Sequence, residues 1–310
     1  MNLDDYGHIK MIKMVVRGIL KSLCALLLMV VFVGGSLYAS GYGYILRATT
    51  NTYLAGFTTA NINDHRAFAT REITAGTVLP WPEHASYNHQ TLPQNLIDFL
   101  DDNKAAAFLV IKDGQLLIEH YFTQYHQASK TNAFSMSKTV LILLVGIAIE
   151  EGIVESLDQK LMDFLPEFAN DHYGRLATIG HLSNMTSGYE WDEGYYSPFS
   201  PVVQLMYGYD IEQFLLQGKF TSLPGERYYY SSASTQLLGI VLQRALEKSA
   251  LNDNLSQYLS KKIWQPLGMN DGALWHLDGA QKMELVFCCI NANARDFAKL
   301  GQLMLAKGRG

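Results

Sequence analysis

The pattern of apolar and polar residues divides this chain into three parts. Four basic residues precede an uncharged stretch from Ser22 to about Leu46: Lys10, Lys13, Arg17 and Lys21. Counted from Ile19, this stretch offers about 20 residues, enough to cross a hydrocarbon core of roughly 30 Å. Gly, Thr, Asn and Pro are frequent from residue 41 to 89, and no long period is visible there. The pattern predicts a membrane anchor or signal segment over 1–46, an extended arm over 47–91 and a folded domain over 92–310.

The folded region alternates one short hairpin with several helices. Two apolar runs, 108–111 and 115–122, flank Lys112-Asp113-Gly114, and an Asp-Gly turn between such runs predicts a β-hairpin. Residues 139–149 have no polar face after the first residue, which indicates a buried core helix too short to span a bilayer. Helices are expected over 92–103, 137–151, 211–216, 234–247, 255–263 and 294–306.

The start of the predicted core helix carries a candidate nucleophile and base. Ser135-Met136-Ser137-Lys138 opens this helix, so Ser135 would lie where free N–H groups and the helix dipole favour developing negative charge. Lys138 would follow one turn later on the same face. A partly desolvated lysine has a lowered pKa and can act as a base. A Ser-x-x-Lys pair occurs about once by chance in a chain of this composition, so a serine N-cap followed by a surface lysine stays an alternative at this point.

A second box supplies a phenol. Tyr230-Ser231-Ser232 follows Pro224-Gly225, and Tyr230 could share proton transfer with Lys138 because a phenol beside an ammonium loses its proton more easily. The loop after Thr186-Ser187-Gly188 carries aromatic residues that are candidates to line an acyl pocket, although packing explains them equally well. The candidate substrate-binding residues are Ser232, Trp191, Tyr195 and Tyr196.

The order of these pieces resembles the serine β-lactamase and penicillin-binding-protein-like family. Its class C-like branch, which includes esterases, D-Ala peptidases and 6-aminohexanoate-dimer hydrolases, is the most similar. The resembling segments are the hairpin at 108–121, the Ser135 box, 157–166, 181–188, the Tyr230 box with 236–239, 263–269 and 294–305. The resemblance implies an α+β fold in which an antiparallel sheet packs against helices, with a helical subdomain beside it. It also implies an acyl-enzyme on Ser135, with Lys138 and Tyr230 moving protons.

Two features depart from the family pattern. Ser232 stands where the family most often has Asn. The third family box, a Lys-Thr-Gly-like or His-x-Gly-like strand that would supply the second oxyanion donor, does not occur before Gly310. The chain is therefore interpreted as lacking the C-terminal strands, and by itself is expected to be a feeble hydrolase of low stability. The two-stranded hairpin would be left without its neighbours.

Composition and charge narrow the range of possible functions. A net charge of −5 and the absence of a basic cluster outside the N-terminus give no reason to expect nucleic-acid binding. Histidines show no metal-ligand spacing, so no metal and no cofactor are expected. Cys24 lies in the leader, whereas the adjacent Cys288 and Cys289 are expected to be small buried residues, since neighbouring cysteines rarely bridge each other.

The sequence therefore predicts a serine hydrolase that acts on a small-molecule or peptide amide or ester. Basic residues before the leader place the domain on the periplasmic or extracytoplasmic side, and an uncleaved anchor is favoured over a removed signal because Leu37-Tyr38-Ala39 is a poor cleavage site. Two alternatives stay open: a non-catalytic relative that binds a peptide or acts as a scaffold, and an inactive truncated product.

Overall fold

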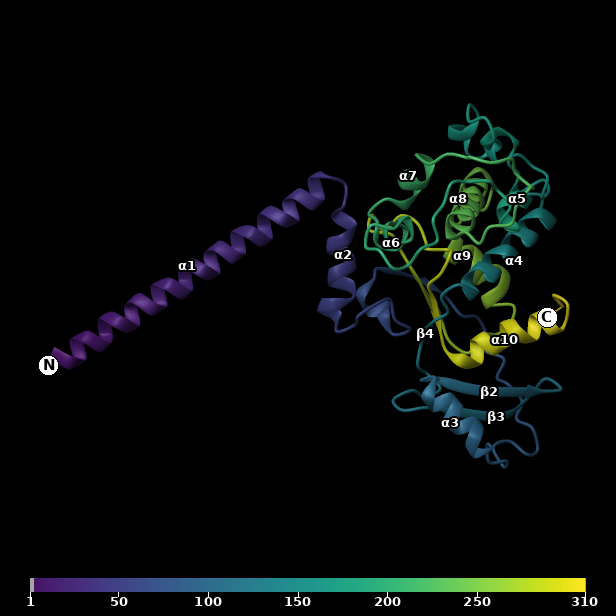
Figure 1. Cartoon of the computed structure of the whole chain (residues 1–310). Coiled ribbons are helices and arrows are strands. Elements are labelled where there is room, and N and C mark those ends of the chain that lie inside the picture. The colour runs from purple at the N-terminus through teal and green to yellow at the C-terminus, as the bar shows by residue number, and fades with distance from the viewer. Residues whose placement is uncertain (1–2, 310) are drawn as a thin grey trace.

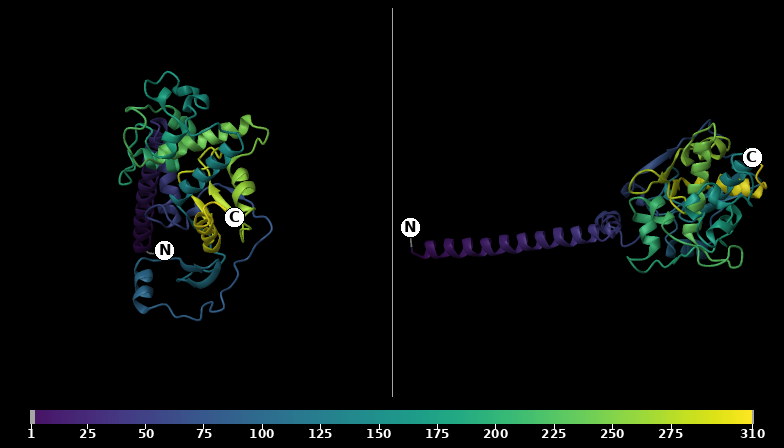
Figure 2. Two further views of the ribbon diagram at one scale, coloured as in Figure 1. Left: turned by 90° about the vertical axis from the view of Figure 1, so that its right-hand side faces the viewer. Right: turned by 90° about the horizontal axis from the view of Figure 1, so that it is seen from above.

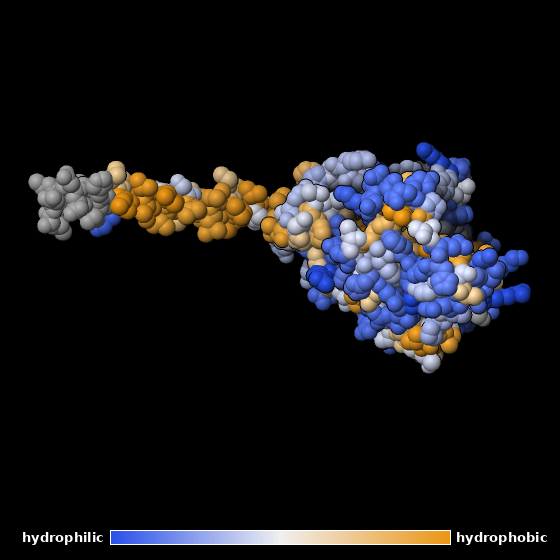
Figure 3. Space-filling view, turned by 90° about the horizontal axis from the view of Figure 1, so that it is seen from below, coloured by the Kyte–Doolittle hydropathy of each residue, from blue (hydrophilic) through white to orange (hydrophobic). Residues whose placement is uncertain are grey.

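The computed structural model describes residues 3–309; residues 1, 2 and 310, which belong to the predicted leader and to the chain end, lie outside the described residues. Helix α1 (Leu3–Ala39) extends away from the body as one long rod (Figure 1; Figure 2). Its segment Met11–Ala39 is long and apolar enough to cross a membrane. The side chains along this segment are exposed and form an apolar surface (Figure 3). One N-terminal helix therefore has the length and composition of a membrane span.

The body contains two separate antiparallel sheets. The larger sheet has the strand order β1-β5-β6-β4, built from β1 (Thr70–Ile73), β5 (Ala273–His276), β6 (Ile290–Ala292) and β4 (Thr131–Asn132). The smaller sheet is the predicted hairpin, β2 (Ala107–Lys112) with β3 (Gln115–Tyr121). Asp113 and Gly114 in its turn both have positive φ, the geometry that an Asp-Gly hairpin turn requires.

Helices lie around the larger sheet (Figure 1). Together, helices and sheet bury one continuous apolar core. Helix α4 (Met136–Glu150) packs against α8 (Ser232–Lys248), and both are central to the core. The other helices are α2 (Gly43–Asn51), α3 (Gln94–Asp102), α5 (Ile179–Ser183), α6 (Pro201–Tyr207), α7 (Ile211–Leu216), α9 (Leu255–Leu259) and α10 (Ala294–Leu305). Short turns of 3₁₀-helix lie between them, and a π-helical turn, Ser260–Trp264, extends α9. The predicted α+β class is confirmed.

The stretch from residue 41 to 89 is more regular than the sequence indicated. It contains helix α2 and strand β1, which pairs with β5 from Thr70 opposite His276 to Ile73 opposite Ala273. The sequence did not predict these two regular elements, and the pairing of β1 depends on a strand about 200 residues further along the chain. Four residues with a mixed pattern give no periodic signal by themselves.

The hairpin is fastened to α10 through an ion pair. Arg295 donates from Nε and Nη2 to the two carboxylate oxygens of Glu119, at 2.7 and 2.6 Å. The hydroxyls of Tyr87 and Tyr121 donate to the same carboxylate, which completes its hydrogen bonding. The hairpin is thus held by a network of bidentate and charge-assisted bonds as well as by its own strand pairing.

Two glycines in the interiors of the packed helices make a matched test of the α4–α8 interface. A Cβ at Gly239 in α8 would overlap the side chain of Val286, whereas a Cβ at Gly146 in α4 would meet nothing within 4 Å. We expect Gly239→Ala to lower the free energy of unfolding by about 1–3 kcal/mol through overpacking. Gly146→Ala should raise it by about 0.5–1 kcal/mol because alanine is the better helix former. Denaturant titration of both variants checks this, and equal effects of the two would contradict the packing.

Candidate active site

Ser135 caps the N-terminal end of α4 and is exposed to solvent. The preceding residue, Phe134, has φ of 44°, a left-handed conformation that is strained for a bulky residue. Two bonds fix this turn to the sheet and to itself: Ser137 Oγ accepts the N–H of Ile290 in β6 at 3.1 Å, and Asn132 Oδ1 accepts the N–H of Phe134 at 2.9 Å. The local fold therefore holds Ser135 on a rigid, strained turn between strand β4 and helix α4.

Lys138 lies directly beneath Ser135. Its Nζ donates to Ser135 Oγ at 3.1 Å and to the backbone carbonyl of Phe287 at 2.7 Å, and the residue is only 7% exposed. Burial lowers the pKa of Lys138 to about 8, while the nearby carboxylate of Glu193 opposes this shift. A neutral amine is therefore accessible near physiological pH and within hydrogen-bond reach of the serine hydroxyl.

Tyr230 and Ser232 reach the same place from the start of α8. The Nζ atom of Lys138 lies 5.1 Å from the centre of the Tyr230 ring and 5.6 Å from that of Phe287, so the amine is enclosed by two aromatic rings. Ser231 caps α8 by accepting the N–H of Ser234 at 3.1 Å. This cap fixes the direction in which the chain enters α8, and with it the positions of Tyr230 and Ser232.

Glu193 is the residue that sequence reasoning missed. Its carboxylate accepts four hydrogen bonds: from Trp191 Nε1 (2.6 Å), Tyr195 OH (2.5 Å), the Ser232 N–H (2.8 Å) and Ser232 Oγ (2.6 Å). The serine that replaces the usual Asn thus points to a carboxylate. The only sequence signal was a pair of acidic residues, Asp192 and Glu193, between the aromatic residues Trp191 and Tyr195, and this signal is weak without the fold.

Three of the four candidate substrate-binding residues meet at this carboxylate, and the fourth does not. Trp191, Tyr195 and Ser232 are joined through Glu193, whereas the Tyr196 side chain is fully exposed. Burial and the hydrogen bond to Glu193 raise the pKa of Tyr195, so its phenol stays protonated and acts as a donor. The loop is therefore held over the site by a neutral phenol, an indole and a hydroxyl.

The expectation that the two adjacent cysteines do not bridge each other was wrong. Cys288 and Cys289 are buried, as the sequence predicted, but their sulfur atoms are joined in a disulfide, which the sequence argument had set aside. Cys289 has φ of 80°, an unusual backbone conformation at this pair that spacing along the chain does not reveal. The pair directly follows Phe287, whose carbonyl binds Lys138.

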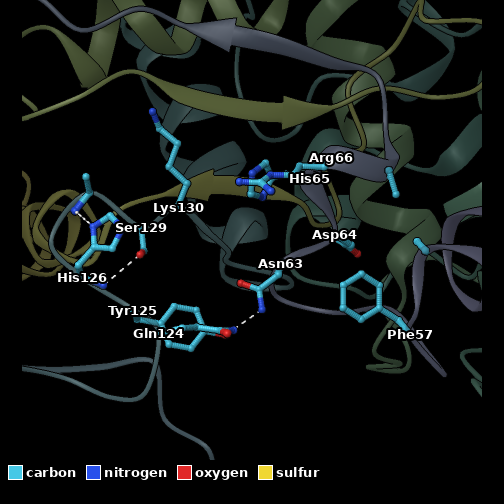
Figure 4. Close-up of a pocket in the computed structure, with 13 residues that line it drawn as sticks. Phe57, Asn63, Asp64, His65, Arg66, Gln124, Tyr125, His126, Ser129 and Lys130 are labelled. Carbon is cyan, nitrogen blue, oxygen red and sulfur yellow. Dashed lines mark hydrogen bonds between the residues drawn. The ribbon is translucent and has the colours of Figure 1, made fainter.

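A large cavity lies apart from these residues. A hollow of about 780 Å³ is lined by residues of two segments, 55–67 and 124–130, and Figure 4 shows the bond from Asn63 Nδ2 to Tyr125 OH that spans it. Neither Ser135 nor its partners line it. Among the described residues, no group of three or more His, Cys, Asp or Glu side chains is arranged to hold a metal ion.

Fold and site together define a class. A mixed α+β body, a serine at the start of a buried helix, a lysine below it and a tyrosine beside the lysine are the features that the family resemblance implied. The family described as Beta-lactamase matches residues 94–283, which is more than half of the chain. The chain therefore belongs to the β-lactamase family, whose members include hydrolases, and the predicted family is confirmed.

Individual relatives agree with this assignment. The chain is 26% identical over 220 residues to a 6-aminohexanoate-dimer hydrolase of Paenarthrobacter ureafaciens, a match that covers 67% of this chain and 54% of that relative. The chain thus spans about half the length of this curated relative. A Bacillus anthracis protein named as a presumed 6-aminohexanoate-dimer hydrolase superposes with a TM-score of 0.67 at 23% identity, over 80% of this chain and 69% of that one.

More distant structures share the fold alone. A penicillin-binding protein of Bacillus halodurans superposes with a TM-score of 0.53 at 15% identity, covering 69% of this chain and 74% of the other. A single-residue mutant of a class C β-lactamase superposes with a TM-score of 0.50 at 16% identity, covering 72% of this chain and 68% of the other. The β-lactamase/transpeptidase-like fold predicted from sequence is confirmed.

Proposed function

We propose that this protein is a serine hydrolase that cleaves an amide or ester bond through an acyl-enzyme on Ser135. The observation that carries the proposal is the bond between Lys138 Nζ and Ser135 Oγ, made by a buried amine whose pKa is lowered to about 8. An exposed serine beside a buried, partly neutral lysine is the arrangement that activates a hydroxyl without histidine.

In the proposed reaction, three side chains take part. Neutral Lys138 accepts the Ser135 hydroxyl proton while Oγ attacks the substrate carbonyl, and a tetrahedral oxyanion forms. The Ser135 N–H, which has no hydrogen-bond partner among residues 3–309, is one donor for that oxyanion. Tyr230, beside Lys138, passes the proton to the leaving nitrogen or oxygen, and the C–N or C–O bond breaks. Water then gives a proton to the neutral Lys138 amine as it attacks the acyl-serine carbonyl. The bond from that carbon to Ser135 Oγ breaks, Oγ takes the proton back, and the carboxylic acid leaves.

The first substrate to test is a linear amide, because the curated relative is named a 6-aminohexanoate-dimer hydrolase. An enzyme that forms an acyl-serine should also be labelled by a fluorophosphonate probe, and peptide mass spectrometry should find the adduct on Ser135. Turnover of the 6-aminohexanoate dimer, a p-nitrophenyl ester and a chromogenic cephalosporin would rank the substrate classes. An adduct on any other residue would refute the proposed nucleophile.

We further propose that α1 anchors the protein in a membrane with the body on the extracytoplasmic side. The apolar segment Met11–Ala39 is exposed along its length, and Lys13, Arg17 and Lys21 lie toward its N-terminal end, which favours retention of that end in the cytoplasm. Resistance to alkaline extraction and a C-terminal reporter active only outside the cytoplasm test this. A soluble product that begins near Ser40 would indicate a removed signal.

Glu193 is expected to tune the pH dependence of acylation. Its carboxylate raises the pKa of Lys138 against the effect of burial. In Glu193→Gln that charge is lost, so Lys138 should become neutral at lower pH. The pH at which the acylation rate reaches half of its maximum should then fall by up to about one unit. Glu190→Gln is the matched control, because Glu190 pairs with Lys219 at the surface of the same loop. A shift upward, or an equal shift in both variants, would contradict this role.

A further inference from the structure

We propose that an apolar turn after α2, residues 53–57, inserts into the surface of the bilayer and fixes the orientation of the folded body on the membrane. The inference rests on the proposed anchor role of α1. It adds a second membrane contact, made by the body itself. The partner is the interfacial layer of a lipid bilayer, where headgroups meet acyl chains.

Helix α1 is joined to the body by a closely bonded junction. Helix α1 ends at Ala39, and Gly41 follows with φ of 82°. The N–H of Tyr42 donates to the carbonyl of Leu37 at 2.8 Å, which closes the helix end in a Schellman motif. Helix α2 begins at Gly43, and its Tyr44 is buried in the core. Arg47 Nη1 donates to the carbonyls of Tyr207 and Gly208 at 3.2 and 2.7 Å, which ties α2 to the end of α6. The anchor therefore continues into the body without a flexible linker.

Helix α2 is followed by an exposed apolar turn. Figure 1 shows α2 on the side of the body from which α1 extends. The 3₁₀ turn η1 (Tyr53–Ala55) follows it, and within this turn Tyr53 is 65% and Leu54 78% exposed. Exposed tyrosine and leucine side chains next to a membrane span are typically found at the level of the lipid headgroups.

Insertion of the turn buries no charged side chain, and three of its five backbone N–H groups are already bonded within the turn. The backbone N–H groups of Ala55 and Phe57 both donate to the carbonyl of Thr52, at 3.0 and 2.9 Å, and the N–H of Gly56 donates to Tyr53 at 3.1 Å. From residue 41 to 63 the only charged side chain is Arg47, which is already bonded to the body. The turn can therefore enter the interface without burying a charge, and the N–H groups of Ala55, Gly56 and Phe57 are already bonded.

The contact has a consequence for the proposed site. Tyr42, at the start of α2, packs edge-on against Phe199 with ring centres 5.5 Å apart. Phe199 ends the loop that carries Trp191, Glu193 and Tyr195. Insertion of the turn into the bilayer surface thus holds this loop, and the proposed site beside it, at a fixed distance from the bilayer and in a fixed orientation.

Two leucines of equal exposure allow a matched test. Leu54 and Leu305 are both 78% exposed, but Leu305 lies at the end of α10, on the opposite side of the body from α1 (Figure 1). The full chain is reconstituted in vesicles of phosphatidylcholine brominated near the headgroup end of its acyl chains, which quenches tryptophan at the interface. We expect Leu54→Trp to add a strongly quenched signal over the four native tryptophans and Leu305→Trp to add an unquenched one.

The outcomes separate the two proposals. If the chain resists alkaline extraction but tryptophan at position 54 is unquenched, the docking inference is wrong and the anchor stands. If the chain is extracted, the anchor proposal itself fails. Tyr53→Trp is the second reporter should Leu54→Trp unfold, and an unquenched signal there also overturns the inference. Equal quenching at positions 54 and 305 would show unspecific adsorption and would refute a fixed orientation.

Discussion

Replacing Ser135 by alanine is expected to abolish covalent labelling by a fluorophosphonate or a fluorescent penicillin. The rate of substrate cleavage should fall by about 10⁴- to 10⁶-fold, the range typical for loss of a nucleophilic serine. The physical reason is that no other hydroxyl receives a hydrogen bond from the Lys138 amine among the described residues. Ser135 is exposed, and its side chain makes no capping bond to the backbone of α4, so its replacement by alanine should leave the fold intact.

Ser137→Ala is the matched control, two positions away at the start of the same helix. Ser137 Oγ accepts the N–H of Ile290 and is buried, so its loss should lower the free energy of unfolding by about 1–3 kcal/mol. Labelling at Ser135 should nevertheless persist at temperatures where this variant is folded. Gel fluorescence and thermal unfolding separate the two effects. Labelling that survives Ser135→Ala, or disappears only in Ser137→Ala, would contradict the assignment of the nucleophile.

Replacing Lys138 by methionine is expected to slow acylation by about 10²- to 10⁴-fold, as for other positioned proton acceptors. In the unsubstituted protein the base is the neutral amine, whose population rises with pH around a pKa of about 8. The acylation rate should therefore be low about two pH units below this pKa, increase through it and level off above it. In the Lys138→Met variant the acylation rate should no longer increase with pH in this range, because the methionine side chain is of similar length but does not titrate.

Lys138→Arg distinguishes a base from a simple positive charge. Arginine keeps the charge but does not lose its proton at accessible pH. If Lys138 acts by accepting the Ser135 proton, the arginine variant should be as slow as the methionine variant. Recovery of most activity in Lys138→Arg would show that electrostatic stabilisation, and not proton transfer, is the role of this residue. Stopped-flow measurement of labelling between about pH 6 and 10 provides both tests.

Local patterns were sufficient for much of the fold. The Asp-Gly turn predicted the β2–β3 hairpin, and the uninterrupted apolar run predicted α4 as a buried helix with Ser135 at its start. Helix α7 was predicted with the bounds that the structure shows, and α3, α8 and α10 within about two residues. These elements are set by periodicity and by turn chemistry over a few residues, which a sequence displays directly.

The sequence also determined which residues to consider for chemistry. Ser135 and Lys138 are three positions apart on one helix, so helical geometry alone brings them together. Tyr230 could be named only because the ordered segments resemble a family, since nothing local relates residue 230 to residue 135. Its place beside Lys138 is given by the packing of α8 against α4.

Only the tertiary structure decided the rest of the site. The carbonyl of Phe287 that binds Lys138, and Glu193 that gathers Trp191, Tyr195 and Ser232, come from segments about 150 and 55 residues beyond the Ser135 box. The pairing of β1 with β5 and the fixed junction of α1, α2 and α6 likewise join distant parts of the chain. A sequence shows each of these groups but not its partner, because burial and hydrogen bonding depend on which segments the folded core brings into contact.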